Sequence, residues 1–161
     1  DPLWSRGLGD VYKRQMMESA LVLLPKVAKD ATFTSCFMHI SNRLLNSALL
    51  DRQVKMINLA ALTNLDVDIT FVYQYAKSLN VHGVETVFGQ VRQTLGVILS
   101  ESVSEYALSQ QARAQKFPQV QPVKVAAILE KLSRGYAHLG LHDLAANCTR
   151  EQELVMRLNQ R

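Results

Sequence analysis

Two histidines and a cysteine near the C-terminal end come closest to the residue types and spacing of a metal site. His138 and His142 stand four residues apart, and Cys148 follows. Side chains four apart share one face of a helix, and imidazole and thiolate are ligands that zinc prefers. Gly140 lies between the histidines, however, and interrupts the helix that their spacing requires. Because a structural zinc site also needs four ligands, we predict no metal site here.

The sequence also lacks the residue patterns typical of acid–base or nucleophilic catalysis. Asp66 and Asp68 are two residues apart, so on a helix their carboxylates point in different directions and cannot work as a pair. The chain has no glycine-rich phosphate loop and no nucleophile elbow. Cys36 and Cys148 are too few and too distant for a disulfide framework, and they fit a reducing cytoplasm. The sequence therefore predicts a protein that is not an enzyme and needs no cofactor.

The charge of the chain is modestly positive, at a formal +4 over 161 residues. Its basic residues in the last third are scattered singly, without the basic runs or interleaved aromatic residues of a nucleic-acid footprint. We therefore predict no nucleic-acid partner. No apolar run approaches the ~18 residues that a membrane-spanning helix needs. With 48% hydrophobic residues, the chain is long enough to bury one core.

Apolar residues recur at helical spacing along most of the chain, which predicts an all-α fold. The first stripe lies between Ala31 and Leu50, the second begins at Val54 and fades by Ser78, and the third runs from Val84 to Tyr106. Turn residues separate the second stripe from the third at 80–83. We predict two further helices, one from Pro122 to near Gly135, and one that starts at Thr149 with a capping box. The expected architecture is an antiparallel helical bundle.

The first fifteen residues are expected to be foreign to the protein. Asp10-Val-Tyr-Lys-Arg-Gln15 looks like the translation of a sequencing adaptor, and it directly precedes Met16-Met17. We therefore predict a disordered segment at 1–15, a bundle core at 16–109, a connecting segment at 110–121, and C-terminal helices at 122–161 that pack on the bundle. The natural chain is expected to continue upstream, which makes this sequence a fragment.

Deletion of residues 1–15 tests this interpretation. A foreign segment contributes nothing to the core, so we expect the melting temperature to stay unchanged in a thermal unfolding experiment. For a domain of this size, about 1 kcal/mol corresponds to roughly 2–4 °C. A larger decrease would show that these residues belong to the folded domain.

Several segments resemble the C-terminal helical domain of the exocyst subunit Sec-fifteen. The most specific is Lys116-Phe-Pro-Gln-Val-Gln-Pro122 followed by Leu129-Glu-Lys, where the family has Lys-Tyr-x-x-Val-x-Pro before a Leu-Leu-Glu-Lys helix. Further matches, in the same order and without a gap until near the C-terminus, are His39-Ile-Ser, Leu49-Leu-Asp-x-x-Val, Leu59-x-Ala-Leu62, and Phe88-x-x-x-Arg-Gln-x-Leu95. The resemblance covers roughly residues 37–160. Glu101-Ser-Val103 stands where the family has Trp-Asp-Trp, so the chain resembles a divergent member.

The resemblance implies a function in vesicle tethering. The family belongs to the complex that brings secretory vesicles to the plasma membrane in exocytosis, and it is recognised as an effector of Rab GTPases. The implied partners are a Rab-family small GTPase in its GTP form and other exocyst subunits. The implied location is cytoplasmic and peripheral, at vesicles and plasma membrane, with membrane association through partners. The alternative is a generic all-α interaction or scaffold domain unrelated to tethering, in which the likeness reflects amphipathic helices alone.

The resemblance also places a binding site. The family's GTPase-contacting helix is centred on an Asn within an alternating pattern that falls on Leu65-Asp-Val-Asp-Ile69. That Asn aligns with Asp66, and Asn64 offers an alternative register. The candidate Rab-binding residues are Asn64, Asp66, Val67 and Ile69. An alternative for the two aspartates, Asp66 and Asp68, is that they are solvated charges on a helix surface.

Overall fold

A computed structural model describes residues 15–16, 19, 22 and 24–160. The segment 1–15, apart from Gln15, lies outside the described residues. Within the described part the secondary structure is helical and includes no strand. The α-helices are α2 (Lys26–Arg43), α3 (Leu59–Ser78), α4 (Val84–Leu99), α5 (Val103–Leu108), α6 (Gln110–Gln115), α7 (Pro122–His138) and α8 (His142–Met156). A π-helical turn, Leu44–Leu49, extends α2, and a 3-10 turn, Arg157–Gln160, follows α8. The prediction of an all-α bundle is confirmed.

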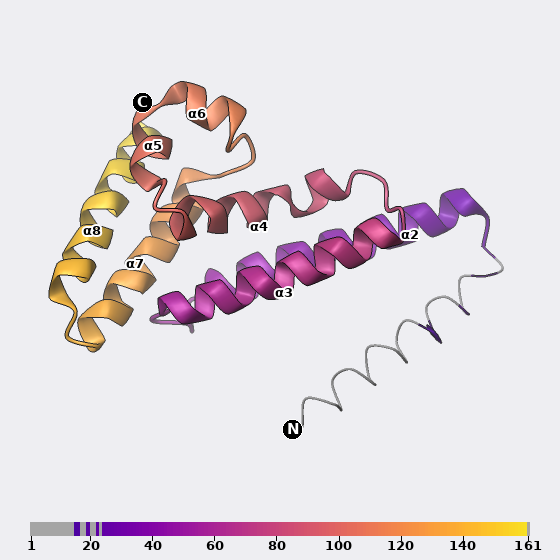
Figure 1. The fold of residues 1–161 in the computed structure, drawn as a ribbon, viewed down its shortest axis with the longest axis horizontal. Helices are drawn as coiled ribbons and strands as arrows, with labels where there is room; N and C mark the ends of the chain where they lie inside the picture. Colours follow the sequence, from indigo (N-terminus) through magenta and orange to yellow (C-terminus); the bar gives the residue numbers. More distant parts are fainter. Residues whose placement is uncertain (1–14, 17–18, 20–21, 23, 161) are drawn as a thin grey trace.

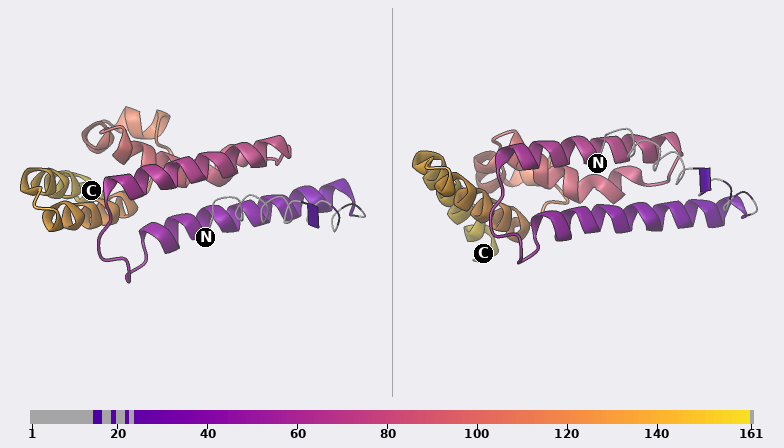
Figure 2. Two further views of the ribbon diagram at one scale, coloured as in Figure 1. Left: turned by 60° about the horizontal axis from the view of Figure 1, so that its bottom comes forward. Right: turned by 90° about the horizontal axis from the view of Figure 1, so that it is seen from below.

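Three long helices form the body of the molecule (Figure 1). The chain runs along α2, returns along α3 and runs back along α4, so that consecutive helices are antiparallel. Helix α4 contacts both α2 and α3. The hairpin of α7 and α8 lies at one end of these rods, where α7 contacts α4 and α8 contacts α5 (Figure 2). The division into 16–109, 110–121 and 122–161 stays a prediction.

The first stripe buries residues that are four positions apart. Phe37, Ser41, Leu45 and Leu49 face the core, whereas Ile40, which shares the helical spacing of the first apolar stripe, is exposed. In an α-helix of 3.6 residues per turn, a row of residues four apart drifts around the axis by about 40° each time. The wider π-helical turn at Leu44–Leu49 reduces that drift, which keeps Leu45 and Leu49 directed inward.

Helix α3 begins later than the second apolar stripe. The prediction that the pattern is helical from Val54 is wrong, because the side chain of Asn58 accepts a hydrogen bond from the backbone N–H of Ala61 (2.7 Å) and starts the helix at Leu59. Ile57 is buried from the preceding segment, and its N–H donates to the carbonyl of Lys131 in α7 (3.1 Å). Apolar burial at 54–57 thus comes from a loop held against α7.

The third stripe is the most completely buried. Its core residues are Val84, Val87, Phe88, Val91, Leu95, Ile98, Val103 and Tyr106. The predicted turn precedes α4, with positive φ at Asn80 (54°) and Gly83 (69°). The stripe is divided between two helices, because Glu101 adopts a positive φ of 53° and ends α4. Val103 and Tyr106 continue the buried face from α5.

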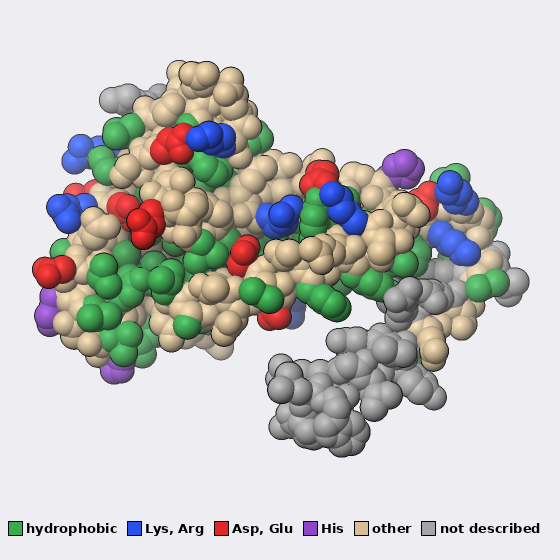
Figure 3. Space-filling model, in the orientation of Figure 1, with side chains coloured by type: hydrophobic (Ala, Val, Ile, Leu, Met, Phe, Trp, Pro, Cys, Tyr) green, Lys and Arg blue, Asp and Glu red, His purple; other side chains and the backbone are tan. Residues whose placement is uncertain are grey.

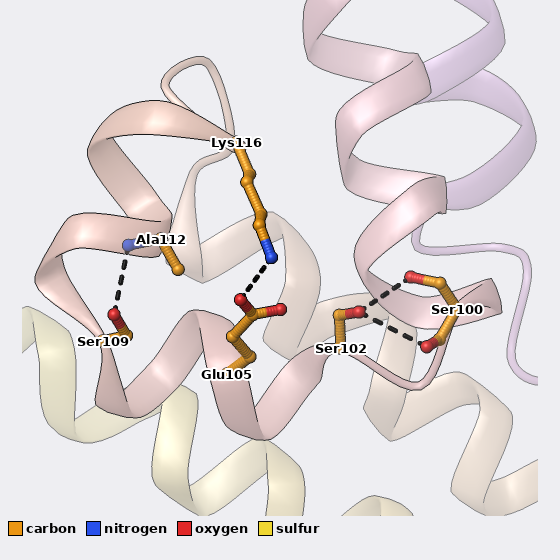
Figure 4. Close-up of polar contacts among 6 residues, drawn as sticks. All are labelled: Ser100, Ser102, Glu105, Ser109, Ala112 and Lys116. Carbon is orange, nitrogen blue, oxygen red and sulfur yellow. Dashed lines mark hydrogen bonds and ion pairs between the residues drawn. The ribbon is translucent and has the colours of Figure 1, made fainter.

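Polar contacts fix the corner formed by α5 and α6 (Figure 4). The hydroxyl of Ser109 accepts from the N–H of Ala112 (3.1 Å) and caps α6. The ammonium of Lys116 pairs with the carboxylate of Glu105 across the corner. The hydroxyl groups of Ser100 and Ser102 lie 2.9 Å apart at the bend between α4 and α5. The segment 110–121 therefore contains a short helix before its extended approach to Pro122.

The C-terminal hairpin confirms one predicted helix start and corrects another. Pro122 opens α7, as predicted, and the helix continues to His138. The last helix does not begin at Thr149: α8 starts at His142, two residues after Gly140, which has a φ of 75°. Thr149 lies inside α8, where its hydroxyl donates to the carbonyl of Ala145 (3.0 Å). A Thr-x-x-Gln sequence therefore does not mark a helix start when the backbone is already helical.

Candidate partner-binding surface

Helix α3 carries the sequence-predicted site, and its inward face fixes which side chains can reach a partner. Leu62, Ile69, Tyr73 and Ala76 are buried against the rest of the bundle. Because residues three, four and seven apart share a face, this row determines the rotation of the helix. The opposite face of α3 is left to solvent.

That opposite face presents an apolar pair beside an amide. Val67 is 62% exposed and Phe71 is 67% exposed, and Asn64 is exposed one turn before them. Since these residues are three and four positions apart, their side chains lie in one row along the helix. We call Asn64, Val67 and Phe71 the α3 stripe. Figure 3 shows hydrophobic side chains on the exposed side of α3.

The structure brings together only part of the predicted site. Asn64 and Val67 share the α3 stripe, whereas Asp66 is half-buried and lies about 200° around the helix from Asn64. The assignment of Ile69 to a contact surface is wrong, because its side chain is fully buried in the core. Of the two registers that the sequence left open, the exposed face supports the one centred on Asn64.

An open hollow adjoins the α3 stripe. It has a volume of about 520 Å³ and lies between α3 and the segment that precedes it. Asn64 and Asp68 line its α3 wall, while Met56, half exposed, lines the opposite wall. The other lining residues are Leu49, Val54, Ile57, Asn58, Ala61 and Leu65. Asn64 is therefore shared by the stripe and the hollow, so that a partner seated on α3 can fill both.

Phe71 was missed by sequence reasoning, although a signal was present. Val67 and Phe71 are an apolar pair four residues apart, and neither lies at the spacing of the buried row of α3. An apolar pair outside the core row of an amphipathic helix indicates a surface feature that folding alone does not explain. The candidate site that the resemblance implies ends at Ile69, two residues before Phe71.

The histidine pair does not form a metal cluster within the described residues, where no group of three or more His, Cys, Asp or Glu side chains could hold an ion. His138 ends α7 and His142 begins α8, so the turn at Gly140 separates them, as expected. Cys148 is buried, and this burial raises the pKa of its thiol. A thiol with a raised pKa is a weak nucleophile and a weak metal ligand.

None of the described helices is both long enough and apolar enough to cross a membrane.

Comparison with known proteins gives a family match over most of the chain. The model described as "Exocyst complex subunit Sec15 C-terminal" matches residues 11–131. A curated relative, "Exocyst complex component 6" of Drosophila melanogaster, is 29% identical over 126 residues, which cover 75% of this chain and 16% of the relative. The chain thus spans about a sixth of the length of that relative. No solved structure matches with significance.

The matched region contains α2 to α6 and the first part of α7, and it includes the α3 stripe and the adjoining hollow. The chain therefore belongs to the family of exocyst subunit Sec15 C-terminal domains.

Proposed function

We propose that this domain serves an exocyst tethering subunit as the effector module that binds a Rab-family GTPase in its GTP form. The observation that carries the proposal is the α3 stripe, a row of one amide and two exposed apolar side chains beside an open hollow. Membership of the Sec-fifteen family supports it, because the stripe lies on the helix that the resemblance singles out. Such a role needs binding and no catalytic residue.

The chemistry of the stripe suits a GTPase switch surface. Switch segments become ordered around the γ-phosphate, and an effector binds their ordered form. Aromatic side chains that become fully buried at the centre of an interface contribute most of the binding free energy. Phe71 and Val67 offer the apolar centre, and Asn64 offers both a donor and an acceptor to the backbone of an ordered switch. Nucleotide dependence follows, since only the GTP form presents the matching surface.

Truncation of the stripe should weaken this binding and leave the fold unchanged. Phe71→Ala should cost about 2 kcal/mol or more of binding free energy, and Val67→Ala and Asn64→Ala about 1–2 kcal/mol each, as for interface hot spots. The measurement is calorimetric titration of each variant against a panel of Rab proteins loaded with GTP or GDP. Circular dichroism should show parental helicity in all three variants.

Two matched variants control the result. Val27→Ala removes the same atoms as Val67→Ala from another highly exposed valine, at the start of α2, and should leave affinity unchanged. Ile69→Ala should instead lower stability by about 2–5 kcal/mol, because its side chain is buried. Parental affinity in all three stripe variants would show that the GTPase does not bind at the α3 stripe. Equal binding of GTP-loaded and GDP-loaded proteins would contradict the effector role itself.

The same proposal includes the other partners of a tethering subunit. The domain would work beside further exocyst subunits, on the cytoplasmic side of secretory vesicles and of the plasma membrane, with its membrane association supplied by partners. The family match argues against an interaction domain unrelated to tethering. Co-precipitation of the full-length subunit with and without this domain would separate complex assembly from GTPase binding.

A further inference from the structure

A second hollow, lined mainly by polar side chains, lies on the α4 side of the bundle and is separate from the α3 stripe. Its volume is about 370 Å³, and it forms where α4 meets the extended segment before α7. The lining residues are Glu85, Thr86, Gly89, Arg92, Gln93 and Gln119. The side-chain oxygen of Gln93 accepts from the backbone N–H of Gln119 (3.0 Å), which joins the two walls. The proposed GTPase contact uses none of these residues.

Arg92 is the cation of this hollow. Its guanidinium group lies over the ring of Tyr73, 4.1 Å from the ring centroid, and the residue is half-buried. Stacking on an aromatic ring holds a guanidinium plane in place but leaves its N–H groups free to donate. Among the described residues, no oxygen accepts a hydrogen bond from Arg92. The group is thus positioned, and its donors are unused.

The one carboxylate among the lining residues already has two partners. Glu85 accepts a hydrogen bond from the hydroxyl of Tyr73 and pairs with the ammonium of Lys77 at 2.9 Å. The Tyr73 hydrogen bond, as the largest cause, and the contact with Lys77 lower the pKa of Glu85, and the positive charge of Arg92 acts in the same direction. Figure 3 shows basic and acidic side chains over α3 and α4. Glu85 therefore satisfies Lys77 and Tyr73, and no ion pair joins it to Arg92 within the part of the chain described.

Gly89 and Gln119 line the hollow together with Arg92. The side-chain amide of Gln119 lies against Gly89, so closely that a Cβ at position 89 would come within 2.5 Å of its oxygen. That amide has no hydrogen-bond partner among the described residues. The hollow consequently offers a fixed cation and a free amide, with the exposed hydroxyl of Thr86 at its rim.

We propose that this hollow binds a carboxylate side chain from an acidic segment of a protein partner, paired with Arg92 and hydrogen-bonded by Gln119. A guanidinium group donates two parallel hydrogen bonds to a planar carboxylate, and such charge-assisted pairs are stronger than neutral ones. A phosphate dianion fits less well, because Arg92 is the sole cation in the lining and would balance only one of its two negative charges. The inference does not depend on the GTPase proposal, since Tyr73 and the α3 stripe lie on opposite faces of α3.

The test is an NMR titration of the whole chain with a small probe, N-acetylglutamate N-methylamide. We expect saturable shifts at the Nε–H of Arg92 and at the side-chain amide of Gln119. The neutral glutamine analogue of the probe should cause none. Arg92→Gln should weaken binding at least about tenfold, which is the effect of losing one charge-assisted hydrogen-bonded pair. Arg52→Gln makes the same substitution at an exposed arginine before α3, which is not among the lining residues, and should leave binding unchanged.

A second variant keeps the cation and displaces the amide. In Gly89→Ala, the added Cβ forces the amide of Gln119 away from the position in which it would donate to the carboxylate. Binding of the glutamate probe should be lost although Arg92 remains. This variant therefore tests the proposed site even if Arg92→Gln fails to fold. Parental affinity in either folded variant, or equal shifts from the glutamine analogue, would overturn the site. Inorganic phosphate shifting the same groups as strongly as the glutamate probe would overturn its assignment to a carboxylate.

Discussion

Phe88→Ala is expected to lower the free energy of unfolding by about 3–5 kcal/mol, the range for a fully buried aromatic side chain. Phe88 has no exposed surface and joins the three long helices. Its ring lies 6.1 Å from that of Phe37 in α2 and 6.0 Å from that of Tyr73 in α3, measured between centroids. Removal of the ring deletes both contacts and leaves a cavity that rigid helices close only in part. Urea unfolding followed by circular dichroism measures the loss.

Leu95→Ala, two turns further along α4, should cost about 2–5 kcal/mol for the same reason. The control is Leu108→Ala, which removes the same atoms from a leucine that is 76% exposed in α5. Its effect should stay within about 0.5 kcal/mol, as for most surface substitutions. Urea midpoints at the parental value for Phe88→Ala and Leu95→Ala would show that the α4 face is not the centre of the core.

The burial of Phe88 and Leu95 could be predicted from sequence because a helix repeats every 3.6 residues, and one buried face leaves a periodic record. Apolar residues follow this period from Val84 to Leu99 with little interruption, and most of their side chains are buried in the structure. The same rule applies to Val125, Ile128, Leu129 and Leu132, whose spacing of 0, 3, 4 and 7 puts them on the buried face of α7. Periodicity therefore yields the helices and their inward faces.

The ends of helices depend on individual caps and turns, which the apolar periodicity does not indicate. Val54 and Ile57 continue an apolar spacing into α3, yet they belong to a loop because the cap at Asn58 starts the helix. Helix α8 begins at His142, seven residues before the expected start at Thr149, after a turn in which Gly140 has a positive φ. Such choices between competing local hydrogen bonds are settled by tertiary contacts.

The sequence predicts that the candidate site lies on a helix, but it predicts only in part which of its side chains are exposed. An alternating pattern at 65–69 cannot place all of its members on one face, since adjacent helical residues are about 100° apart. Ile69 therefore belongs to the core, while Asn64 and Val67 face solvent. The hollow beside Asn64 could not be predicted from the helical pattern, because its far wall comes from residues 49–57.

That far wall is held by α7, through contacts that the sequence does not reveal. The ammonium of Lys131 donates to the carbonyl oxygens of Leu49 (2.6 Å) and Asp51 (2.7 Å). One turn further along α7, Gly135 faces the carbonyl oxygen of Ile57, so closely that a Cβ at position 135 would lie 2.1 Å from that oxygen. In the sequence, Gly135 indicates only the end of a helix. In the structure, its missing side chain lets the segment before α3 approach α7.

Gly135→Ala should therefore destabilise the domain by about 2–3 kcal/mol, towards the upper end of the range for overpacking. The oxygen of Ile57 cannot move away freely, because the N–H of the same residue donates to the carbonyl of Lys131. Elsewhere in a helix, replacement of glycine by alanine stabilises by roughly 0.5–1 kcal/mol. Gly96→Ala in α4 is the matched control: a Cβ there meets nothing within 4 Å, so the substitution should stabilise.

The informative quantity is the opposite sign of the two effects in urea unfolding. Propensity alone predicts that both variants gain stability, since both glycines lie inside α-helices. If Gly135→Ala gained as much as Gly96→Ala, the close approach of Ile57 to α7 would be wrong. Because the same contact shapes the hollow beside Asn64, a folded Gly135→Ala protein should also bind a GTP-loaded Rab protein less tightly. Gly96→Ala should bind it like the parent.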